Sequence, residues 1–322
     1  MKRIAVFTSG GDAPGMNACI RAVVRTGIKL GVEIIGIMRG YEGLIDGEME
    51  LLQSHSVSNI IQNGGTILQS ARSERFKTVE GRKQAYEQLK NHNIDGIVAI
   101  GGDGTFSGAS VFMKEFKIPI IGVPGTIDND LYGTDYTIGY DTAINTAMWA
   151  LDNIKDTANA HNRLFFVEVM GRDSGFIALR SGIATGAEAV LVPESPTEID
   201  KLVEMLDENY RNKKRSSVIV VAEGDEIGGA FKIAEEVKKR NSIYDTKVTV
   251  LGHIQRGGRP TCMDRVLASR LGLEAVKALI DGVSGVMIGQ IHNNISYTPF
   301  EKATKYHITV NPLLLEMVNI LA

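Results

Sequence analysis

The sequence predicts an α/β fold of two doubly wound three-layer domains with mostly parallel sheets and the active cleft between them. Three observations support this fold class. Short apolar runs alternate with amphipathic helical patterns, which is typical of parallel sheets covered on both faces. Glycine-rich, charged clusters follow directly on the apolar runs. A length of 322 residues suits two domains better than one.

The first half of the chain opens with a short apolar run that predicts a buried strand at residues 4–7. Ile20, Val24 and Ile28 then follow at helical spacing, and Gly31 is expected to end that helix. Further strands are predicted at residues 32–38, 96–100 and 118–123.

The second half of the chain repeats this rhythm, and no low-complexity linker separates the two halves. We therefore expect no flexible hinge segment between the domains. The predicted strands are residues 164–169, 189–192, 217–221 and 246–251, and the predicted helices are residues 199–210 and 231–240.

Composition narrows the class of protein. The formal net charge is -3 and the basic residues are scattered, so the sequence does not indicate a general nucleic-acid binder. Two cysteines are too few for a disulfide framework, and we expect both Cys19 and Cys262 to be small buried side chains. The first apolar run is too short for a signal peptide, and no run approaches a membrane span. We therefore expect a soluble cytoplasmic protein.

Six polar clusters stand at the ends of predicted strands. Ligands of open parallel sheets bind beyond the carboxyl ends of the strands, so these clusters predict one large ligand site. The clusters are TSGGD (8–12), GGDGT (101–105), PGTIDND (124–130), MGRDSG (170–175), AEGDE (222–226) and GHIQRGG (252–258).

The two glycine-rich clusters of the first half have the composition of phosphate-binding loops. Their glycines let backbone N–H groups approach an anion at the start of a helix. A tight strand-to-helix turn explains the TSGGD cluster equally well. The GGDGT cluster is the stronger indication, because Asp103 adds a carboxylate that can hold Mg²⁺.

The PGTIDND cluster places two carboxylates, Asp128 and Asp130, directly after a buried strand. Phosphoryl transfer to an alcohol needs a group that accepts the hydroxyl proton and a metal that neutralises phosphate charge. One aspartate can serve as the base while the other lies near the metal. An Asx-turn with solvated acids is the alternative, and the buried strand before the cluster favours a functional role.

Several motifs together resemble those of a known enzyme family. GGDGT resembles a loop shared by phosphofructokinases, NAD kinases and diacylglycerol kinases. TSGGDAPGMNA, GGDGT, PGTIDND, VEVMGR and LGHIQRGG occur in the order found in bacterial ATP-dependent 6-phosphofructokinases, and the resemblance covers about residues 1–290. It implies Mg²⁺-dependent transfer of the ATP γ-phosphoryl group to the 1-hydroxyl of fructose 6-phosphate. It also implies an ATP-binding domain of residues 1–138 plus 256–305 and a sugar-phosphate-binding domain of residues 139–255 plus 306–322.

The resemblance also implies roles for single residues. Asp128 would be the general base and Asp130 a supporting acid, while Thr126 would help to seat the transferred group. Arg72 and Arg172 would bridge the donor and the acceptor. The implied ATP ligands are Gly11, Arg72, Ser73, Gly102, Asp103, Gly104 and Thr105, with Asp103 at Mg²⁺. The implied sugar-phosphate ligands are Thr126, Ile127, Asp128, Arg163, Met170, Gly171, Arg172, Glu223, Lys247, His253 and Arg256.

The family is tetrameric, so the resemblance implies self-association as a homotetramer. Arg163 and Lys247 would reach the sugar phosphate bound to a neighbouring subunit. Family members usually have Arg at the position of Lys247, so this chain keeps the charge and loses the bidentate fork.

The family also has an effector site for ADP or phosphoenolpyruvate, and this chain departs from its pattern. Ser54 and Asn212 replace cationic residues, which predicts weak regulation. The implied effector residues that remain are Arg21, Arg25, Lys155, Glu188 and Lys214, with Lys155 in place of an Arg.

Two alternative functions stay open at this point. A pyrophosphate-dependent enzyme of the same fold is the closer one, although such relatives carry Asp and Lys where this chain has Gly104 and Gly125. A non-catalytic sensor of nucleotide and sugar phosphate is the other. The presence of Asp103, Asp128 and Arg172 argues against the sensor.

Overall fold

The chain forms two compact units, neither of which is a continuous segment. The computed structural model describes residues 1–161, 163–212, 217–306 and 308–321. No helix among these residues is long and apolar enough to cross a membrane. Unit 1 comprises Met1–Ile127, Leu131–Thr142 and Arg256–Ile308, and unit 2 comprises Asp128–Asp130, Ala143–Gln255 and Thr309–Ala322.

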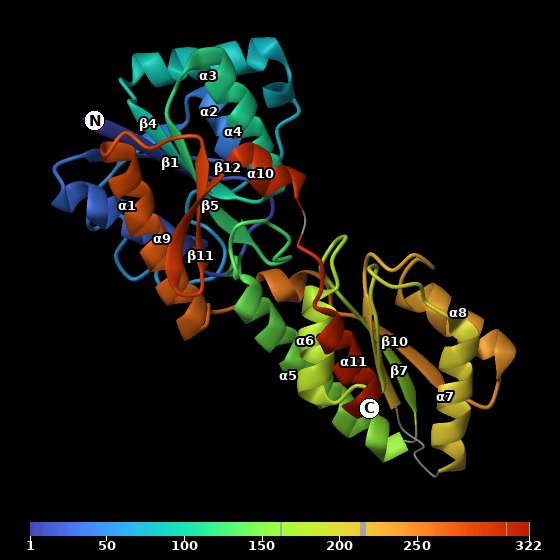
Figure 1. Cartoon of the computed structure of the whole chain (residues 1–322). Coiled ribbons are helices and arrows are strands. Elements are labelled where there is room, and N and C mark those ends of the chain that lie inside the picture. The colour runs from blue at the N-terminus through green and yellow to red at the C-terminus, as the bar shows by residue number, and fades with distance from the viewer. Residues whose placement is uncertain (162, 213–216, 307, 322) are drawn as a thin grey trace. The chain divides into compact units, whose positions relative to one another are not determined.

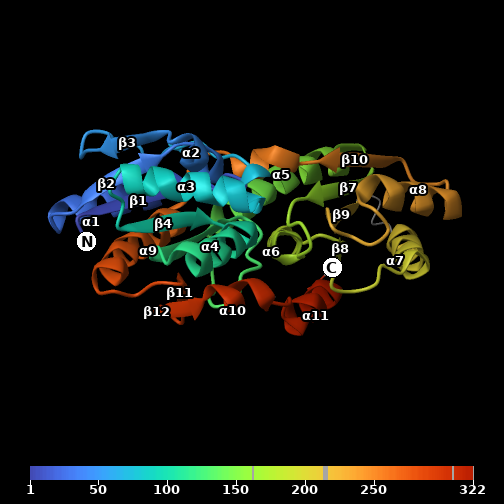
Figure 2. The same cartoon turned by 90° about the horizontal axis from the view of Figure 1, so that it is seen from above.

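Unit 1 is built on a mixed sheet of mostly parallel strands. Its strands are β1 (Arg3–Thr8), β2 (Glu33–Ile37), β3 (Met49–Leu52), β4 (Gly96–Gly101), β5 (Ile120–Thr126), β6 (Ile138–Gly139), β11 (Val286–Ile291) and β12 (Asn294–Pro299). They run in the order β12-β11-β5-β4-β1-β2-β3, with β6 beside β5. Figure 2 shows this row from above, with the antiparallel strands β3 and β12 at its edges. The strand order reverses between β1 and β4, the point where ligands bind in sheets of this kind.

Helices cover both faces of the unit 1 sheet (Figure 1). α1 (Met16–Lys29) and α9 (Cys262–Ile280) pack together on one face. The other face holds α2 (Gly40–Asp46), η1 (Arg75–Lys77), α3 (Val79–Asn91), α4 (Asp103–Phe116) and α10 (Phe300–Lys305). Alternate residues of β1 show how the sheet is buried, because Ala5 and Phe7 pack into the core beneath α2 and α4 with Tyr41 and Phe106.

A buried carboxylate joins the starts of two helices in unit 1. Asp264, in the first turn of α9, accepts hydrogen bonds of 2.8 Å from the backbone N–H groups of Gly139 and Thr142. These two residues flank the start of α5 (Tyr140–His161). Burial raises the pKa of Asp264 to about 6. The hydrogen bonds satisfy N–H groups that a helix start would otherwise leave unpaired.

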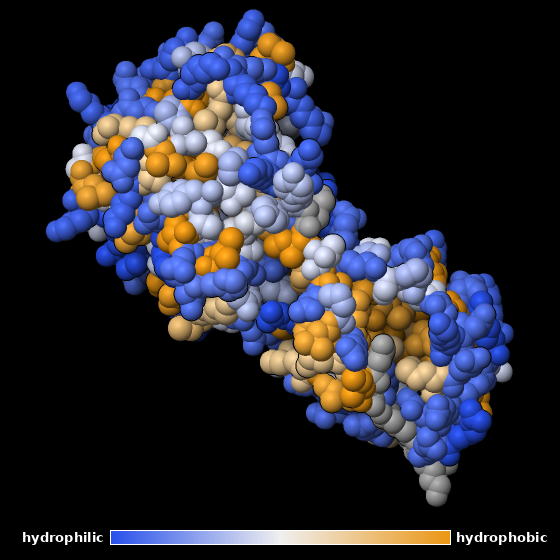
Figure 3. Space-filling view, in the orientation of Figure 1, coloured by the Kyte–Doolittle hydropathy of each residue, from blue (hydrophilic) through white to orange (hydrophobic). Residues whose placement is uncertain are grey.

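Unit 2 contains a smaller sheet in which every strand pairing is parallel. Its strands are β7 (Leu164–Val169), β8 (Ala189–Leu191), β9 (Ser217–Ala222) and β10 (Thr246–Val250), in the order β10-β7-β9-β8. α7 (Ile199–Arg211) and α8 (Ala230–Arg240) cover one face, with Leu164, Phe166 and Ile219 in the core between them and the sheet. α6 (Phe176–Thr185) and α11 (Pro312–Leu321) lie on the other face, and Figure 3 shows exposed apolar side chains over α11.

The predicted α/β class is confirmed, and every predicted strand is present with small shifts at its ends. The strand predicted at 118–123 extends to Thr126, so part of the PGTIDND cluster lies in β5. The antiparallel edge strands were not predicted. Cys19 is buried as expected, but the prediction for Cys262 is wrong. Cys262 is the first residue of α9, where the helix start reaches the surface, and its side chain is exposed.

Candidate active site

Three loops that follow neighbouring strands of unit 1 meet at one end of its sheet. β4 pairs with β1 on one side and with β5 on the other. The Ser9 N–H donates to the Ile100 carbonyl at 3.0 Å, and the Thr105 hydroxyl donates to the Ser9 carbonyl at 3.2 Å. A Cβ atom built on Gly102 would lie 3.6 Å from Thr126. The TSGGD, GGDGT and PGT segments therefore adjoin, as their places in a parallel sheet predict.

The start of α4 has the features of an anion and metal site. Gly102 is the N-cap of the helix and Asp103 is its first residue, so the first backbone N–H groups are left without helical partners. The Asp103 carboxylate is half-buried at this helix start. No group of three or more His, Cys, Asp or Glu in the described chain could hold a metal. Mg²⁺ typically binds one or two carboxylates together with substrate phosphates, so a single Asp103 fits it.

Arg256 lies against the first glycine-rich loop in unit 1. Its guanidinium donates to the Asp12 carbonyl at 3.3 Å. A Cβ atom on Gly11 would collide with that guanidinium, so a larger residue there would displace the Arg256 side chain. Arg256 was predicted as a sugar-phosphate ligand, and within its own unit it adjoins a predicted nucleotide residue.

The predicted nucleotide residues Arg72 and Ser73 lie on a loop of unit 1 before η1. The Ser73 hydroxyl accepts from the Phe76 N–H at 3.1 Å and donates to the Glu42 carboxylate. The Arg72 side chain is exposed beside it. Glu42 was not predicted as a site residue, because it lies in a helix and outside every glycine-rich cluster.

The predicted base Asp128 lies in unit 2, beside the loop that follows β7. Asp128 is 7% exposed, and its backbone carbonyl accepts from the Ser174 hydroxyl at 2.9 Å. The same hydroxyl lies 2.9 Å from the Gly171 carbonyl. Asn129 has a φ of 53°, so the chain turns sharply between the half-buried Asp130 and the base. The two aspartates and the MGRDSG cluster are therefore brought together.

Glu223 organises that loop from the end of β9. Its Oε1 atom accepts from the backbone N–H groups of Gly171 at 3.3 Å and Arg172 at 2.7 Å. Arg172 has a φ of 55°, which is uncommon for a residue with a side chain, and these bonds help to hold it there. The Met170 N–H donates to Gln255 at 3.3 Å. The described part of unit 2 thus brings together five predicted sugar-phosphate ligands, Asp128, Met170, Gly171, Arg172 and Glu223. His253 is exposed in η2 (Gly252–Arg256), close in sequence to Gln255.

Arg163 and Lys247 lie at the opposite end of the unit 2 sheet. Arg163 precedes β7, and Lys247 stands in β10 opposite Phe165, the second residue of β7. The MGRDSG cluster follows the other end of β7. At about 3.3 Å per residue, a strand of this length separates its two ends by roughly 16–20 Å. These two cations therefore cannot share one pocket with Gly171 in the same unit.

One carboxylate that the sequence reasoning missed holds the two cations together. Asp245 accepts from Arg163 Nε at 2.9 Å and pairs with Lys247 Nζ at 2.8 Å. The hydrogen bonds from Lys247 and Arg163 lower the pKa of Asp245. Asp245 lies in no sequence motif. The feature that could have identified it is its place between the predicted phosphate ligands Arg163 and Lys247.

The predicted effector residues are divided between the two units. Arg21 and Arg25 lie on α1 of unit 1, one turn apart. In unit 2, the Lys155 ammonium donates to the carbonyls of Thr185 and Gly186 at 2.5 and 2.8 Å, at the carboxyl end of α6. Glu188 follows this helix end and is buried. Lys214 lies outside the described residues.

The chain's similarity to known proteins extends over its whole length. The family model described as phosphofructokinase matches residues 3–279. The chain belongs to the phosphofructokinase family. The ATP-dependent 6-phosphofructokinase 1 of Thermus thermophilus is 56% identical over 322 residues, which is 100% of both chains. The ATP-dependent 6-phosphofructokinase 2 of Bacteroides thetaiotaomicron is 55% identical and covers 100% of this chain and 98% of its own.

Solved phosphofructokinase structures share the fold. The enzyme from Saccharomyces cerevisiae superimposes with a TM-score of 0.90 at 38% identity, covering 95% of this chain and 45% of the yeast chain. A pyrophosphate-dependent phosphofructokinase from Marinobacter aquaeolei gives a TM-score of 0.85 at 24% identity, with 97% and 86% coverage. The second likeness shows the fold alone.

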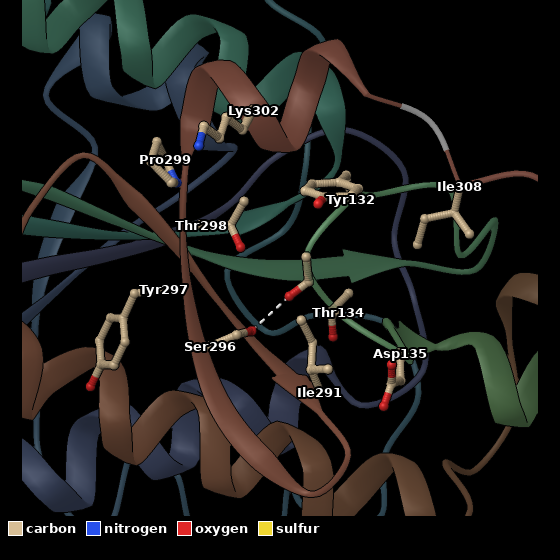
Figure 4. A pocket seen from close by; sticks show the side chains of 11 residues that line it. Tyr132, Thr134, Asp135, Ile291, Ser296, Tyr297, Thr298, Pro299, Lys302 and Ile308 are labelled. Carbon is tan, nitrogen blue, oxygen red and sulfur yellow. Dashed lines mark hydrogen bonds between the residues drawn. The ribbon is translucent and has the colours of Figure 1, made fainter.

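A pocket of about 470 Å³ in unit 1 lies apart from these phosphofructokinase motifs. Tyr132, Thr134, Tyr297 and Lys302 line it beside the edge strand β12 (Figure 4). The Ser296 hydroxyl donates to the Gly133 carbonyl at 2.6 Å, so it is already used within the protein. None of the predicted site residues lines this pocket.

Proposed function

We propose that this chain transfers the γ-phosphoryl group of ATP to the 1-hydroxyl of fructose 6-phosphate, giving fructose 1,6-bisphosphate and ADP in glycolysis. One observation carries the proposal. Bacterial relatives named ATP-dependent 6-phosphofructokinase match the whole chain at 55–56% identity. The loops after β4, β5 and β7 carry the residue types that such a reaction needs, which supports the proposal.

Unit 1 would bind the nucleotide. The N–H groups at the start of α4 and the backbone around Gly11 suit phosphate oxygens. Arg72 and Thr126 would contact the phosphoryl group that is transferred. Asp103 would hold Mg²⁺, which neutralises charge on the phosphates when it is bound. The remaining nucleotide ligands in this proposal are Ser73, Gly102, Gly104 and Thr105.

Unit 2 would bind the sugar phosphate and supply the base. Asp128 would accept the proton of the 1-hydroxyl as the oxygen attacks the γ-phosphorus, and Asp130 would support it. Arg172 would stabilise negative charge that develops during transfer. The loop held by Glu223 keeps Arg172 in place. Other proposed ligands of the sugar phosphate are Ile127, Met170, Gly171, His253 and Arg256.

Arg163 and Lys247 would serve the sugar phosphate bound to another copy of the chain. Their position at the far end of the unit 2 sheet supports this role, since they lie roughly 16–20 Å along β7 from the MGRDSG cluster. Two cations side by side suit a phosphate dianion. The active form would therefore be an oligomer, and we propose a homotetramer in the cytoplasm.

A regulatory site for ADP or phosphoenolpyruvate is the last part of the proposal. Arg21, Arg25, Glu188 and Lys214 would form it, with a reduced contribution from Lys155. The two bonds from Lys155 to α6 carbonyls support that reduction, because a ligand must compete with them.

A coupled assay with purified protein tests the proposed function. One reaction contains Mg²⁺, fructose 6-phosphate and ATP, and the release of ADP is measured. A parallel reaction contains pyrophosphate in place of ATP, and the release of inorganic phosphate is measured. We expect turnover that requires the sugar phosphate and proceeds with ATP. A rate with pyrophosphate comparable to that with ATP, or binding of both substrates without turnover, would contradict the proposal.

A further inference from the structure

The loop that contains Arg72 is held by hydrogen bonds on both sides of that residue. On the near side, the Thr8 hydroxyl donates to the Gln69 carbonyl at 2.7 Å, and the Ser70 hydroxyl donates to the Gly10 carbonyl. Both partners belong to the end of β1 and the first glycine-rich loop. On the far side, the Ser73 hydroxyl donates to a carboxylate of α2. An exposed arginine therefore sits on a backbone segment with two fixed ends.

The hydrogen bond after Arg72 is the one from Ser73 to Glu42, a residue in the first turn of α2. Its Oε2 atom accepts from Ser73, and its Oε1 atom accepts from Arg75 Nη1 at 2.7 Å. The bond from Ser73 and the pair with Arg75 lower the pKa of Glu42, so the carboxylate is charged at neutral pH. The Glu42 side chain is 19% exposed, and Arg75 also reaches Asp46 at 2.8 Å. The two oxygens of the Glu42 carboxylate thus hold Ser73 and Arg75.

The neighbouring residue on α2 extends this support to the GGDGT loop. Tyr41 is buried, and its hydroxyl donates to the Thr105 carbonyl at 2.6 Å in the first turn of α4. Its ring stacks on Phe76 with 3.9 Å between ring centroids. A Cβ atom on Gly108 would lie 3.2 Å from the same ring. One turn of α2 therefore contacts both nucleotide segments, through Tyr41 on one side and Glu42 on the other.

We propose that Glu42 is a positioning residue for nucleotide binding. Its carboxylate fixes the Ser73 end of the loop so that Arg72 meets the ATP phosphates without first being ordered. A loop that is ordered before binding loses less conformational entropy when the ligand arrives. This inference rests on the proposed function, because it assigns Arg72 to the nucleotide. Glu42 itself touches neither substrate in this proposal.

Glu42→Ala tests the proposal through the two Michaelis constants. We expect the KM for ATP to rise about tenfold, the low end for a lost charge-assisted hydrogen bond. The KM for fructose 6-phosphate should stay within about twofold of the wild type, because the proposed sugar-phosphate ligands of unit 2 lie outside this loop. The kcat should fall as well, since Arg72 also contacts the transferred phosphoryl group in this proposal. Glu42→Gln keeps an acceptor oxygen for Ser73 and the same shape. It should raise the KM for ATP by less than Glu42→Ala does. This difference distinguishes loss of the hydrogen bond to Ser73 from a general loss of folding.

Glu48→Gln is the matched control. Glu48 accepts from Arg39 at 2.7 and 2.5 Å beside the same helix, and in the described structure it makes no bond to Ser73 or Arg75. Its KM for ATP should be unchanged. An equal rise in Glu48→Gln, or an equal rise in both Michaelis constants of Glu42→Ala, would overturn the proposal.

Calorimetry with Mg²⁺ and a non-hydrolysable ATP analogue separates this inference from the proposed function. Wild-type protein that binds the analogue but shows no turnover would contradict the function and leave Glu42 testable. Under the proposal, the dissociation constant of the analogue rises about tenfold in Glu42→Ala. The effect should shrink in a Ser73→Ala background, because the two residues act through one bond. An unchanged dissociation constant, or fully additive effects, would contradict the positioning role.

Discussion

The two units arrange their predicted ligands differently. In unit 1, the segments after β1, β4 and β5 meet at one end of the sheet, and side chains of α2 bond to the segment after β4 and to the loop of Arg72. In unit 2, the ligands are split between the two ends of β7, with Arg172 and Glu223 at one end and Arg163 and Lys247 at the other. A parallel sheet collects ligands for its own site at its carboxyl end. Under the proposed function, the pair at the amino end serves the site of another copy of the chain.

The cations of the two units also differ in how they are paired. Arg72 of unit 1 is exposed between two fastened residues. In unit 2, Arg163 and Lys247 share Asp245, and Lys155 is held by helix carbonyls. A ligand that binds these cations of unit 2 must therefore compete with their existing partners or bind next to them. We expect changes at the start of α4 and in the Arg72 loop of unit 1 to act mainly on ATP. Changes among the unit 2 ligands should act on the sugar phosphate or the effector.

The largest expected effect is that of removing the base. Asp128→Asn keeps the size of the side chain and removes the carboxylate, so kcat should fall at least about 10²-fold. Binding of fructose 6-phosphate should survive, because the phosphate ligands remain. Steady-state rates together with sugar-phosphate binding by calorimetry check this. A variant with kcat close to that of the wild type would remove Asp128 from its role.

A smaller effect is expected at the amino end of the unit 2 sheet. Arg163→Ala should raise the KM for fructose 6-phosphate by about 10- to 100-fold, with little change in the KM for ATP, since hydrogen bonds between charged groups are lost. Mixing Arg163→Ala with Asp128→Asn under subunit exchange should restore some activity. Absence of recovery, with hybrid oligomers shown to form, would mean that Arg163 does not serve a neighbour.

The proposed nucleotide site of unit 1 is tested by placing a negative charge at Gly104, near the start of α4. A Cβ atom on Gly104 would meet nothing within 4 Å, so Gly104→Asp should leave the unfolding temperature unchanged. Its carboxylate would repel the ATP phosphates, and the KM for ATP should rise about tenfold. The KM for fructose 6-phosphate is the internal control. Gly125 differs, because a Cβ atom there would lie 3.0 Å from Ile100 and from Met16, so a change at Gly125 also strains the core.

The smallest effect is expected from phosphoenolpyruvate. Initial rates against fructose 6-phosphate, with and without millimolar effector, should show half-saturation points that differ by no more than about twofold. Lys155→Ala should change this little, because the ammonium is engaged with Thr185 and Gly186. A strong rightward shift in the wild type would show that the remaining effector residues suffice.

The strands and the loops after them were predictable because apolar runs and glycine clusters are local signals. GGDGT and PGTIDND adjoin since their strands are neighbours, and the order of strands in such sheets follows few patterns. Glu42 and Asp245 were not predicted, because neither lies in a motif and each bonds to a residue distant in sequence, Ser73 for Glu42 and Arg163 for Asp245. The exposure of Cys262 depends on where one helix starts, which composition does not reveal.

The most direct test of the account is the identity of the product. Purified protein is incubated with Mg²⁺, ATP and fructose 6-phosphate, and the reaction is followed by ³¹P NMR. The account predicts a new phosphomonoester at the sugar's first carbon, formed in step with ADP and absent when the sugar phosphate is left out. ADP released together with inorganic phosphate and no second sugar ester, or a phosphoester at another carbon, would contradict it.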